Sequence, residues 1–98
     1  MTHRLIFEPL VAEDLTDAVG HYESIATQLA NRFRQKVNQR LDVIAQRPES
    51  FPIDIAPIRF AKVDRFPYLI FFVFKPEFVS ILAIVHGASD PSRWRDRE

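Results

Sequence analysis

One histidine near the C-terminal end, His86, is the clearest candidate for acid–base chemistry in this chain. It ends an apolar run and is followed by a glycine. An imidazole exchanges a proton near neutral pH, and charge that develops during a reaction is stabilised by nearby cations. Arg59, Lys62 and Arg65 could supply those cations. The interpretation that we favour is structural: His86 ends a strand and hydrogen-bonds to nearby backbone or to Asp90.

The C-terminal tail offers a second candidate site. Trp94 lies between Arg93 and Arg95, and it could stack on a nucleic-acid base or on a side chain of a partner. Because aromatic rings most often serve packing, we favour the alternative in which Trp94 folds back onto an open edge or face of a sheet. Asp90 would then cap a final turn, as Asx-Pro segments often do. We expect Arg95 and Arg97 to be solvated.

Three bases recur at four-residue spacing and therefore share one face of a helix: Arg32, Lys36 and Arg40. This row could contact nucleic acid or an acidic surface of a partner protein. The alternative that we favour is pairing with Glu13 and Asp17, since opposite charges would face each other across two neighbouring antiparallel helices. Surface pairs of this kind stabilise a fold by less than about 1 kcal/mol each.

Composition limits the chemistry that the chain can carry out. The absence of cysteine excludes disulfides, thiolate catalysis and cysteine-based zinc sites. The three histidines lack the spacing of metal ligands, and two glycines are too few for a phosphate-binding loop, so we expect no metal and no cofactor. With 13 basic and 13 acidic residues, the net charge of zero argues against a general nucleic-acid binder.

The chain is expected to be a single soluble domain over residues 1–98. A hydrophobic fraction of 47%, with nine phenylalanines, is enough to form a buried core. The N-terminal residues do not show the pattern of a secretory signal, and no apolar run reaches the roughly 18 residues of a membrane span. We therefore expect a cytoplasmic protein that does not insert into a membrane.

Periodicity predicts the elements that must position these residues. The first half shows apolar stripes at three- and four-residue spacing, which are typical of amphipathic helices, and the second half shows short apolar runs typical of strands. The expected elements are a strand over 4–8, helices over 11–26 and 29–45, and strands over 58–63, 68–74 and 78–85. Gly20 interrupts the first helix, where we expect either close packing or a local weakness.

The order β-α-α-β-β-β predicts a small α+β domain. A short connection between the two helices implies a helical hairpin, and short turns between the last three strands favour antiparallel pairing, so the N-terminal strand and the helical hairpin would pack on a small antiparallel sheet. The run 68–74 is apolar on both faces, as in a central strand. A partner chain or the C-terminal tail should cover part of the second face, which contains too much apolar surface to stay wet.

Several motifs occur in an order and spacing that resemble one protein family. They are the aromatic-proline pair Phe51-Pro52 after the second helix, the run RFPYLIFFVF, and the ending ILAIVHGASDP. Together with the two helical segments, these motifs cover nearly the whole chain. The chain resembles the RelE/ParE superfamily of toxins from type II toxin–antitoxin systems, and most closely its ParE-like, plasmid-stabilisation branch.

The resemblance implies a toxin that arrests growth when its cognate antitoxin is lost. ParE-like members inhibit DNA gyrase by protein contact, and the antitoxin wraps the toxin with a segment that orders on binding, in a complex that could be a heterotetramer, while the toxin alone could be a homodimer. We expect this mechanism here, with partner contacts made by Arg32, Lys36, Arg40, Tyr68, Phe72, Trp94 and Arg95.

RelE-like members imply the alternative, a ribosome-dependent ribonuclease that cleaves messenger RNA. Cleavage through a 2′-hydroxyl needs a base, an acid and cations for the phosphorane charge, which His86, Arg59 and Arg65 would supply. The ribonuclease branch typically carries a dense set of cations on its sheet, whereas this chain has few. A third alternative is a member that keeps the fold without toxicity.

Overall fold

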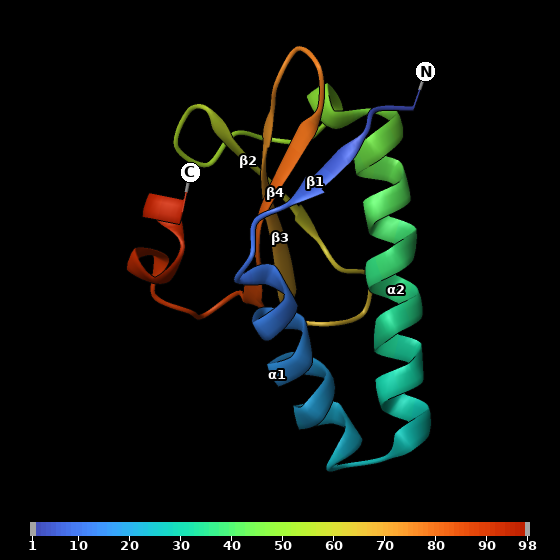
Figure 1. Cartoon of the computed structure of the whole chain (residues 1–98). Helices are drawn as coiled ribbons and strands as arrows, with labels where there is room; N and C mark the ends of the chain where they lie inside the picture. The colour runs from blue at the N-terminus through green and yellow to red at the C-terminus, as the bar shows by residue number, and fades with distance from the viewer. Residues whose placement is uncertain (1, 98) are drawn as a thin grey trace.

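The computed structural model describes residues 2–97, which form an α+β fold in the expected element order (Figure 1). The helices and strands within this range are β1 Leu5–Phe7, α1 Val11–Glu23, α2 Thr27–Gln46, β2 Ile58–Lys62, β3 Tyr68–Phe74 and β4 Val79–His86. Single turns of 3-10 helix occupy Pro48–Ser50, Pro91–Arg93 and Arg95–Arg97. The predicted fold class is therefore confirmed.

Helices α1 and α2 form the predicted hairpin and lie against one face of the sheet (Figure 1). Ala26 adopts an extended conformation (φ −165°, ψ 136°) that separates the two helices. The buried residues recur at helical spacing, as the stripes predicted: Val11, Asp14, Ala18, Val19 and Tyr22 on α1, and Ala30, Phe33, Val37, Ile44 and Ala45 on α2. Asp14 is the unexpected member of this set.

The sheet order is β1-β4-β3-β2, and its pairing is mixed. β2, β3 and β4 pair antiparallel as predicted, but β1 pairs parallel to β4 at the edge, with Leu5 opposite Val79 and Phe7 opposite Ile81. The direction of the chain explains this difference from a purely antiparallel sheet. β1 and α1 run one way and α2 returns, so β2 starts in the direction of β1, and two further reversals make β4 parallel to β1 (Figure 1).

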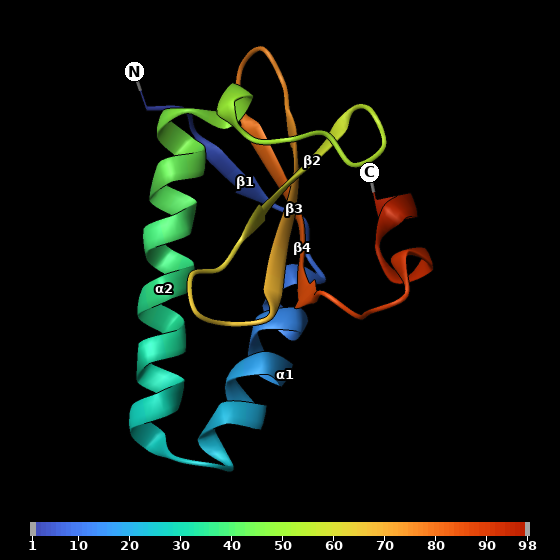
Figure 2. The ribbon, with the colours of Figure 1, turned by 180° about the vertical axis from the view of Figure 1, so that it is seen from behind.

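The second face of the sheet is covered by the C-terminal tail, which lies on the side opposite to α2 (Figure 2). Trp94 is 2% exposed and stacks on Phe71, with ring centroids 3.7 Å apart and an interplanar angle of 21°. Leu82 and Val85 of β4 complete the apolar cluster beneath the tail. Of the two covers expected for this face, a partner chain or the tail, the structure shows the tail.

Candidate functional site

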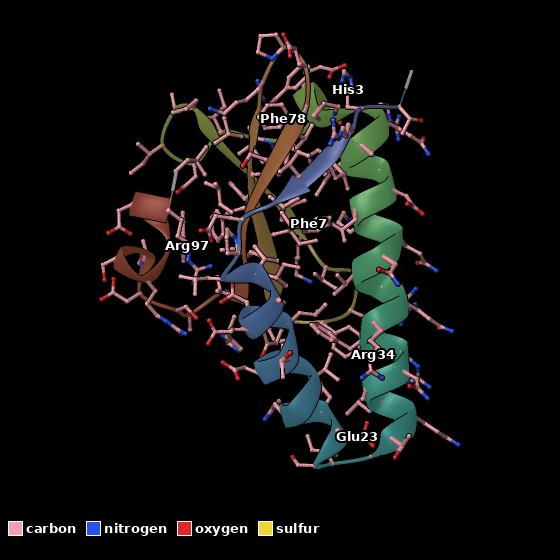
Figure 3. The ribbon with its side chains drawn as sticks, in the orientation of Figure 1. His3, Phe7, Glu23, Arg34, Phe78 and Arg97 are labelled. Carbon is pink, nitrogen blue, oxygen red and sulfur yellow. The ribbon has the colours of Figure 1, made fainter. Side chains whose placement is uncertain are left out.

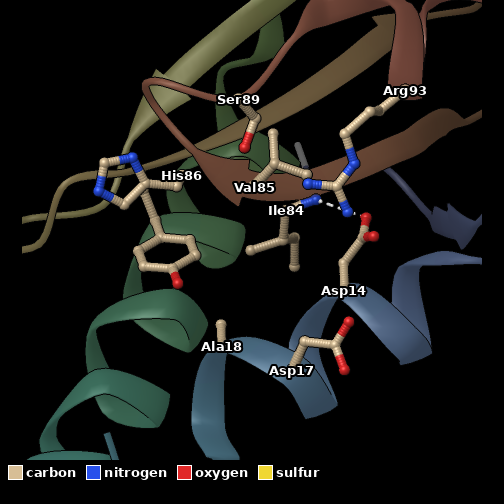
Figure 4. A pocket seen from close by; sticks show the side chains of 9 residues that line it. Asp14, Asp17, Ala18, Ile84, Val85, His86, Ser89 and Arg93 are labelled. Atoms are coloured by element: carbon tan, nitrogen blue, oxygen red, sulfur yellow. Dashed lines mark hydrogen bonds between the residues drawn. The ribbon is translucent and has the colours of Figure 1, made fainter. Parts of the chain in front are cut away.

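The end of the sheet where β3 begins and β4 ends contains a polar hollow of about 120 Å³ (Figure 4). α1 forms one wall of this hollow, the two strand ends form its floor, and the C-terminal tail forms the opposite wall. We name it the strand-end pocket. Its lining residues are Asp14, Asp17, Ala18, Tyr68, Ile84, Val85, His86, Ser89 and Arg93.

His86 is the last residue of β4 and lies opposite Tyr68 of β3. The two rings make an edge contact, with centroids 5.5 Å apart. The imidazole Nδ1 accepts a hydrogen bond from the backbone N–H of Ala88 at 3.0 Å, so the ring proton belongs on Nε2. The backbone contact expected of a strand-end histidine is therefore present. Asp90 is used differently, since its carboxylate caps the next turn by accepting from the N–H of Ser92 at 3.0 Å.

Tyr68 presents its phenol ring to the strand-end pocket. Partial burial is the main cause that raises its pKa above the ordinary value, and the nearby negative charge of Asp17 raises it further. The hydroxyl therefore stays protonated at neutral pH and can donate a hydrogen bond. It can serve as a donor in this site but not as a base.

Arg93 extends from the tail into the strand-end pocket toward α1 (Figure 4). Within residues 2–97, neither the Arg93 guanidinium nor the Asp17 carboxylate has a hydrogen bond or an ion pair in its side chain. The pocket therefore presents an uncommitted cation, an uncommitted anion and a phenol donor to the solvent. Sequence reasoning passed over Arg93 and Asp17 as pocket residues because they come from segments far apart in the chain.

A buried ion pair between Asp14 of α1 and Arg97 of the C-terminal tail lies beside this pocket, and Figure 3 labels Arg97 while Figure 4 labels Asp14. The Asp14 carboxylate accepts from both terminal nitrogens of Arg97, at 2.7 Å for Nη1 to Oδ2 and 3.2 Å for Nη2 to Oδ1. It also accepts from the N–H of Ile84 at 3.1 Å, while Arg97 Nη1 donates to the carbonyl of Leu82 at 3.0 Å. The hydrogen bond to Asp14 raises the pKa of Arg97.

The ion pair takes the place of a strand at the edge of β4. The last ladder bond from the β1 side is donated by the N–H of Glu8 to the carbonyl of Ile81 at 2.9 Å. Beyond that point Leu82 and Ile84 have backbone groups that no strand reaches, and the two charged side chains satisfy them instead. Arg97 was expected to be solvated, and this expectation was wrong, because the open strand edge gives it buried acceptors.

The structure does not bring the three proposed catalytic residues together. Arg59 on β2 lies opposite Phe72 of β3, whereas His86 lies opposite Tyr68 of β3. The four residues between Tyr68 and Phe72 separate the two positions by about 13 Å along the strand direction. Its guanidinium donates to the carbonyls of Phe51 at 2.6 Å and Glu49 at 3.3 Å and so holds the loop after α2. Arg65, in the β2–β3 turn with a positive φ of 68°, lies at the same sheet end as His86.

The residues proposed for partner contact fall into different environments. Phe72 is fully buried beneath the helices, edge-on to Phe51, so it supports the core. Trp94 is buried as described above, whereas Arg95 is exposed, as expected, and its guanidinium also pairs with Asp54 at 3.3 Å. Tyr68 is the half-buried aromatic residue of that set, and it lines the strand-end pocket.

The basic row on α2 does not pair with α1. Lys36 Nζ lies 3.4 Å from the Asp64 carboxylate, in the β2–β3 turn. Arg32 is exposed and Arg40 is half-buried, and neither has an ion pair within the described part of the chain. The expected pairing with Glu13 and Asp17 is therefore wrong, because the row faces the β2–β3 turn.

Among residues 2–97 there is no group of three histidine, aspartate or glutamate residues placed to hold a metal ion. No helix in the same range is long and apolar enough to cross a membrane.

Comparisons with known proteins address the family. The model of a family described as the ParE toxin of the type II toxin–antitoxin system parDE matches residues 5–91. A solved structure, the chromosomal ParDE TA system from P. aeruginosa, superposes with a TM-score of 0.76. It is 20% identical, and the match covers 87% of this chain and 96% of that chain, which shows a shared fold. No curated protein gives a significant match.

Proposed function

Because the chain belongs to the ParE toxin family of type II toxin–antitoxin systems, we propose that it is neutralised by a cognate antitoxin and acts by binding a protein target. DNA gyrase is the leading target. Growth arrest would follow when the antitoxin is lost, and a plasmid or chromosomal segment that encodes both partners would be stabilised. The chain would work in the cytoplasm, where such a target is found.

The separation of Arg59 from His86 is the observation that favours binding of a partner over catalysis. A phosphoryl-transfer site needs its acid–base group and its cations within hydrogen-bond reach of one substrate. Arg59 is already committed to two loop carbonyls, on a different part of the sheet from His86. The geometry therefore favours a surface that contacts a partner.

The strand-end pocket is our candidate for that contact. Its uncommitted polar side chains would gain partners without any existing pair having to break, since Asp17 and Arg93 have none among the described residues. Tyr68 adds an aromatic surface with a hydroxyl donor, which is a common composition for the centre of a protein interface.

A ribonuclease remains the second candidate, on one specific observation. His86 and Arg93 line the same pocket, and Arg65 lies at the same end of the sheet. This set would supply an acid–base group and two cations without Arg59. The two candidates make opposite predictions about RNA.

The test is a map of cellular RNA 5′ ends in a bacterial host, taken minutes after the full chain is induced alone. We expect growth arrest without new cuts in translated frames, and inhibition of supercoiling by purified gyrase when the purified chain is added. The contact would be made by Asp17, Tyr68 and Arg93, whereas the imidazole Nδ1 of His86 already accepts from the N–H of Ala88, so His86→Ala should leave most of the toxicity intact. His21→Ala changes another exposed histidine, on α1 and away from the pocket, and is the matched control. New cuts that disappear in His86→Ala but persist in His21→Ala would establish the ribonuclease instead.

A further inference from the structure

A half-buried arginine on α2 lacks an acceptor. The Nε atom of Arg40 is enclosed by protein, and no group of residues 2–97 accepts a hydrogen bond from it. A guanidinium stays charged at every physiological pH, so burial is not relieved by loss of a proton. Buried donors without partners are uncommon in proteins and call for an explanation. The Nε atom itself is closed to solvent, so an acceptor from outside the chain would meet the terminal nitrogens of the same guanidinium.

Arg40 lies at a hollow of about 160 Å³ between α2 and the β2–β3 turn, which we name the α2 hollow. Its lining residues are Lys36, Gln39, Arg40, Val43 and Asp64. This volume exceeds many times the space that one water molecule needs, so a carboxylate group can enter. The Gln39 amide adds a further donor at the wall, and Val43 provides an apolar side for a methylene stem.

The α2 hollow holds two cations and one anion. The Asp64 carboxylate lies 3.4 Å from Lys36 Nζ and is 56% exposed, and it makes no ion pair with Arg40. The local charge is therefore one positive unit in excess. A single additional carboxylate would balance it and would give the planar guanidinium the paired acceptor that it binds best.

We propose that the α2 hollow binds an aspartate or glutamate side chain from an acidic, extended segment of a partner protein. The row of bases sets the spacing of that segment. Arg32, Lys36 and Arg40 are four residues apart on a helix, so they repeat every ~6 Å. Side chains on one side of an extended chain repeat every ~6.6 Å. A segment with an acid at every second residue therefore matches the row when it lies along α2.

A peptide fits this surface better than nucleic acid does. Asp64 stays in the α2 hollow, where it would repel the continuous charge of a phosphate backbone, and the chain as a whole has a net charge of zero. A peptide can place a neutral residue opposite Asp64. That the segment belongs to the antitoxin rests on the proposed function, whereas the binding of a carboxylate by the α2 hollow does not.

The test follows the arginine Nε–H resonances of the ¹⁵N-labelled full chain during titration with a peptide. The probe is Glu-Ala-Glu-Ala-Glu, compared with Gln-Ala-Gln-Ala-Gln and with an oligothymidylate of equal net charge. We expect the Arg40 resonance to shift with the acidic peptide, and Arg40→Gln to weaken its binding by about tenfold. Arg34→Gln removes the same charge from another side of α2, which faces α1 in Figure 3, and should change binding by less than about twofold.

Asp64→Asn adds a test with the opposite sign. Loss of the internal carboxylate frees Lys36, so binding of the acidic peptide should tighten more than in Asp42→Asn, a matched change on α2 outside the α2 hollow.

Equal weakening by Arg40→Gln and Arg34→Gln would overturn the proposal in favour of diffuse surface charge. A larger Arg40 shift with oligothymidylate would overturn it in favour of nucleic acid. A chain that binds the peptide through Arg40 but arrests no growth would support this inference and overturn the proposed function.

Discussion

Asp14 occupies a position on the apolar stripe of α1 where a hydrophobic residue would be expected. The stripe passes through Val11, Asp14 and Ala18, at spacings of three and four residues. Removal of a carboxylate from water is costly, and here three hydrogen bonds from Arg97 and Ile84 offset that cost. A charged residue inside an apolar stripe is the signal in the sequence that could have identified this pair.

Loss of one member of the ion pair should be strongly destabilising. Asp14→Ala leaves the Arg97 guanidinium and the N–H of Ile84 buried without their acceptor, so we expect the free energy of unfolding to fall by about 3 kcal/mol. Urea unfolding of the purified protein measures this. Asp17→Ala, one turn further along the same helix and exposed, should change stability by less than about 0.5 kcal/mol. Similar losses in both variants would contradict a special role for Asp14.

The two tyrosines should make stability fall at alkaline pH. Burial raises the pKa of both Tyr22 and Tyr68 in the folded state, so the unfolded chain gives up these protons first. The stability from the neutral phenols is present below the unfolded pKa of about 10, and it is lost as the pH rises through the folded pKa values. Thermal unfolding at a series of pH values from neutral to alkaline measures the loss.

The charge of Asp17 gives that pH dependence a specific test. Asp17→Asn removes the anion that disfavours the Tyr68 phenolate, so the tyrosinate absorbance of Tyr68 should appear at lower pH than in the parent chain. Because the charge of Tyr68 also raises the pKa of Tyr22, Tyr22→Phe is introduced into both proteins, which leaves Tyr68 as the titrating phenol. An unchanged titration of Tyr68 in Asp17→Asn would show that burial alone raises its pKa.

At the scale of elements, α1 carries a glycine without a packing reason. A Cβ added to Gly20 would meet no atom within 4 Å, so the close packing that its position suggested is absent. Glycine inside a helix costs stability through the backbone entropy of the unfolded chain, and nothing at this position compensates for that cost. The structure excludes close packing as the reason for Gly20, so of the two expectations the local weakness of the helix remains.

Gly20→Ala should therefore stabilise the protein. We expect the free energy of unfolding to rise by about 0.5–1 kcal/mol, because alanine restricts the unfolded chain and fits the open space beside α1. Chemical denaturation of both proteins gives the difference. Ala12→Gly, an exposed position on the same helix, should lower stability by a similar amount. Destabilisation by Gly20→Ala would mean that another group needs the space.

At the scale of the whole molecule, the C-terminal tail closes a second core. The Trp94 ring covers Phe71, and two ion pairs anchor the tail, Arg95 to Asp54 of the loop before β2 and Arg97 to Asp14 of α1. Both pairs lie near the C-terminal end of the tail and join it to segments far away in the sequence. The apolar surface of the central strand, which would otherwise favour association with another chain, is mostly covered from within.

Removal of the Trp94 ring should reopen this face. Trp94→Ala is expected to lower the free energy of unfolding by about 3–5 kcal/mol and to promote self-association, because Phe71 and Leu82 lose their cover. Light scattering after size exclusion, together with urea unfolding, measures both effects. Trp94→Phe keeps an aromatic ring in the stack and should retain most of the stability. A monomeric Trp94→Ala chain of unchanged stability would show that the tail is dispensable for this face.

The local patterns of the sequence determined the elements and the family. Helical stripes and apolar runs depend on neighbouring residues, so α1, α2 and the three antiparallel strands could be predicted with ends within about three residues. The motifs around Phe51-Pro52 and RFPYLIFFVF identified the ParE-like branch. The backbone contact of His86 also followed from its place at the end of a strand. These features rest on spacing along the chain.

The tertiary structure alone decided which charges meet. Asp14 pairs with Arg97, Lys36 with Asp64 and Arg95 with Asp54, and each pair joins segments whose approach depends on the packing of other elements. The parallel position of β1 likewise depends on where the helical hairpin returns the chain. Coulombic pairing has no periodicity in sequence, because it depends on distance in space and on the backbone groups that a short edge strand leaves open.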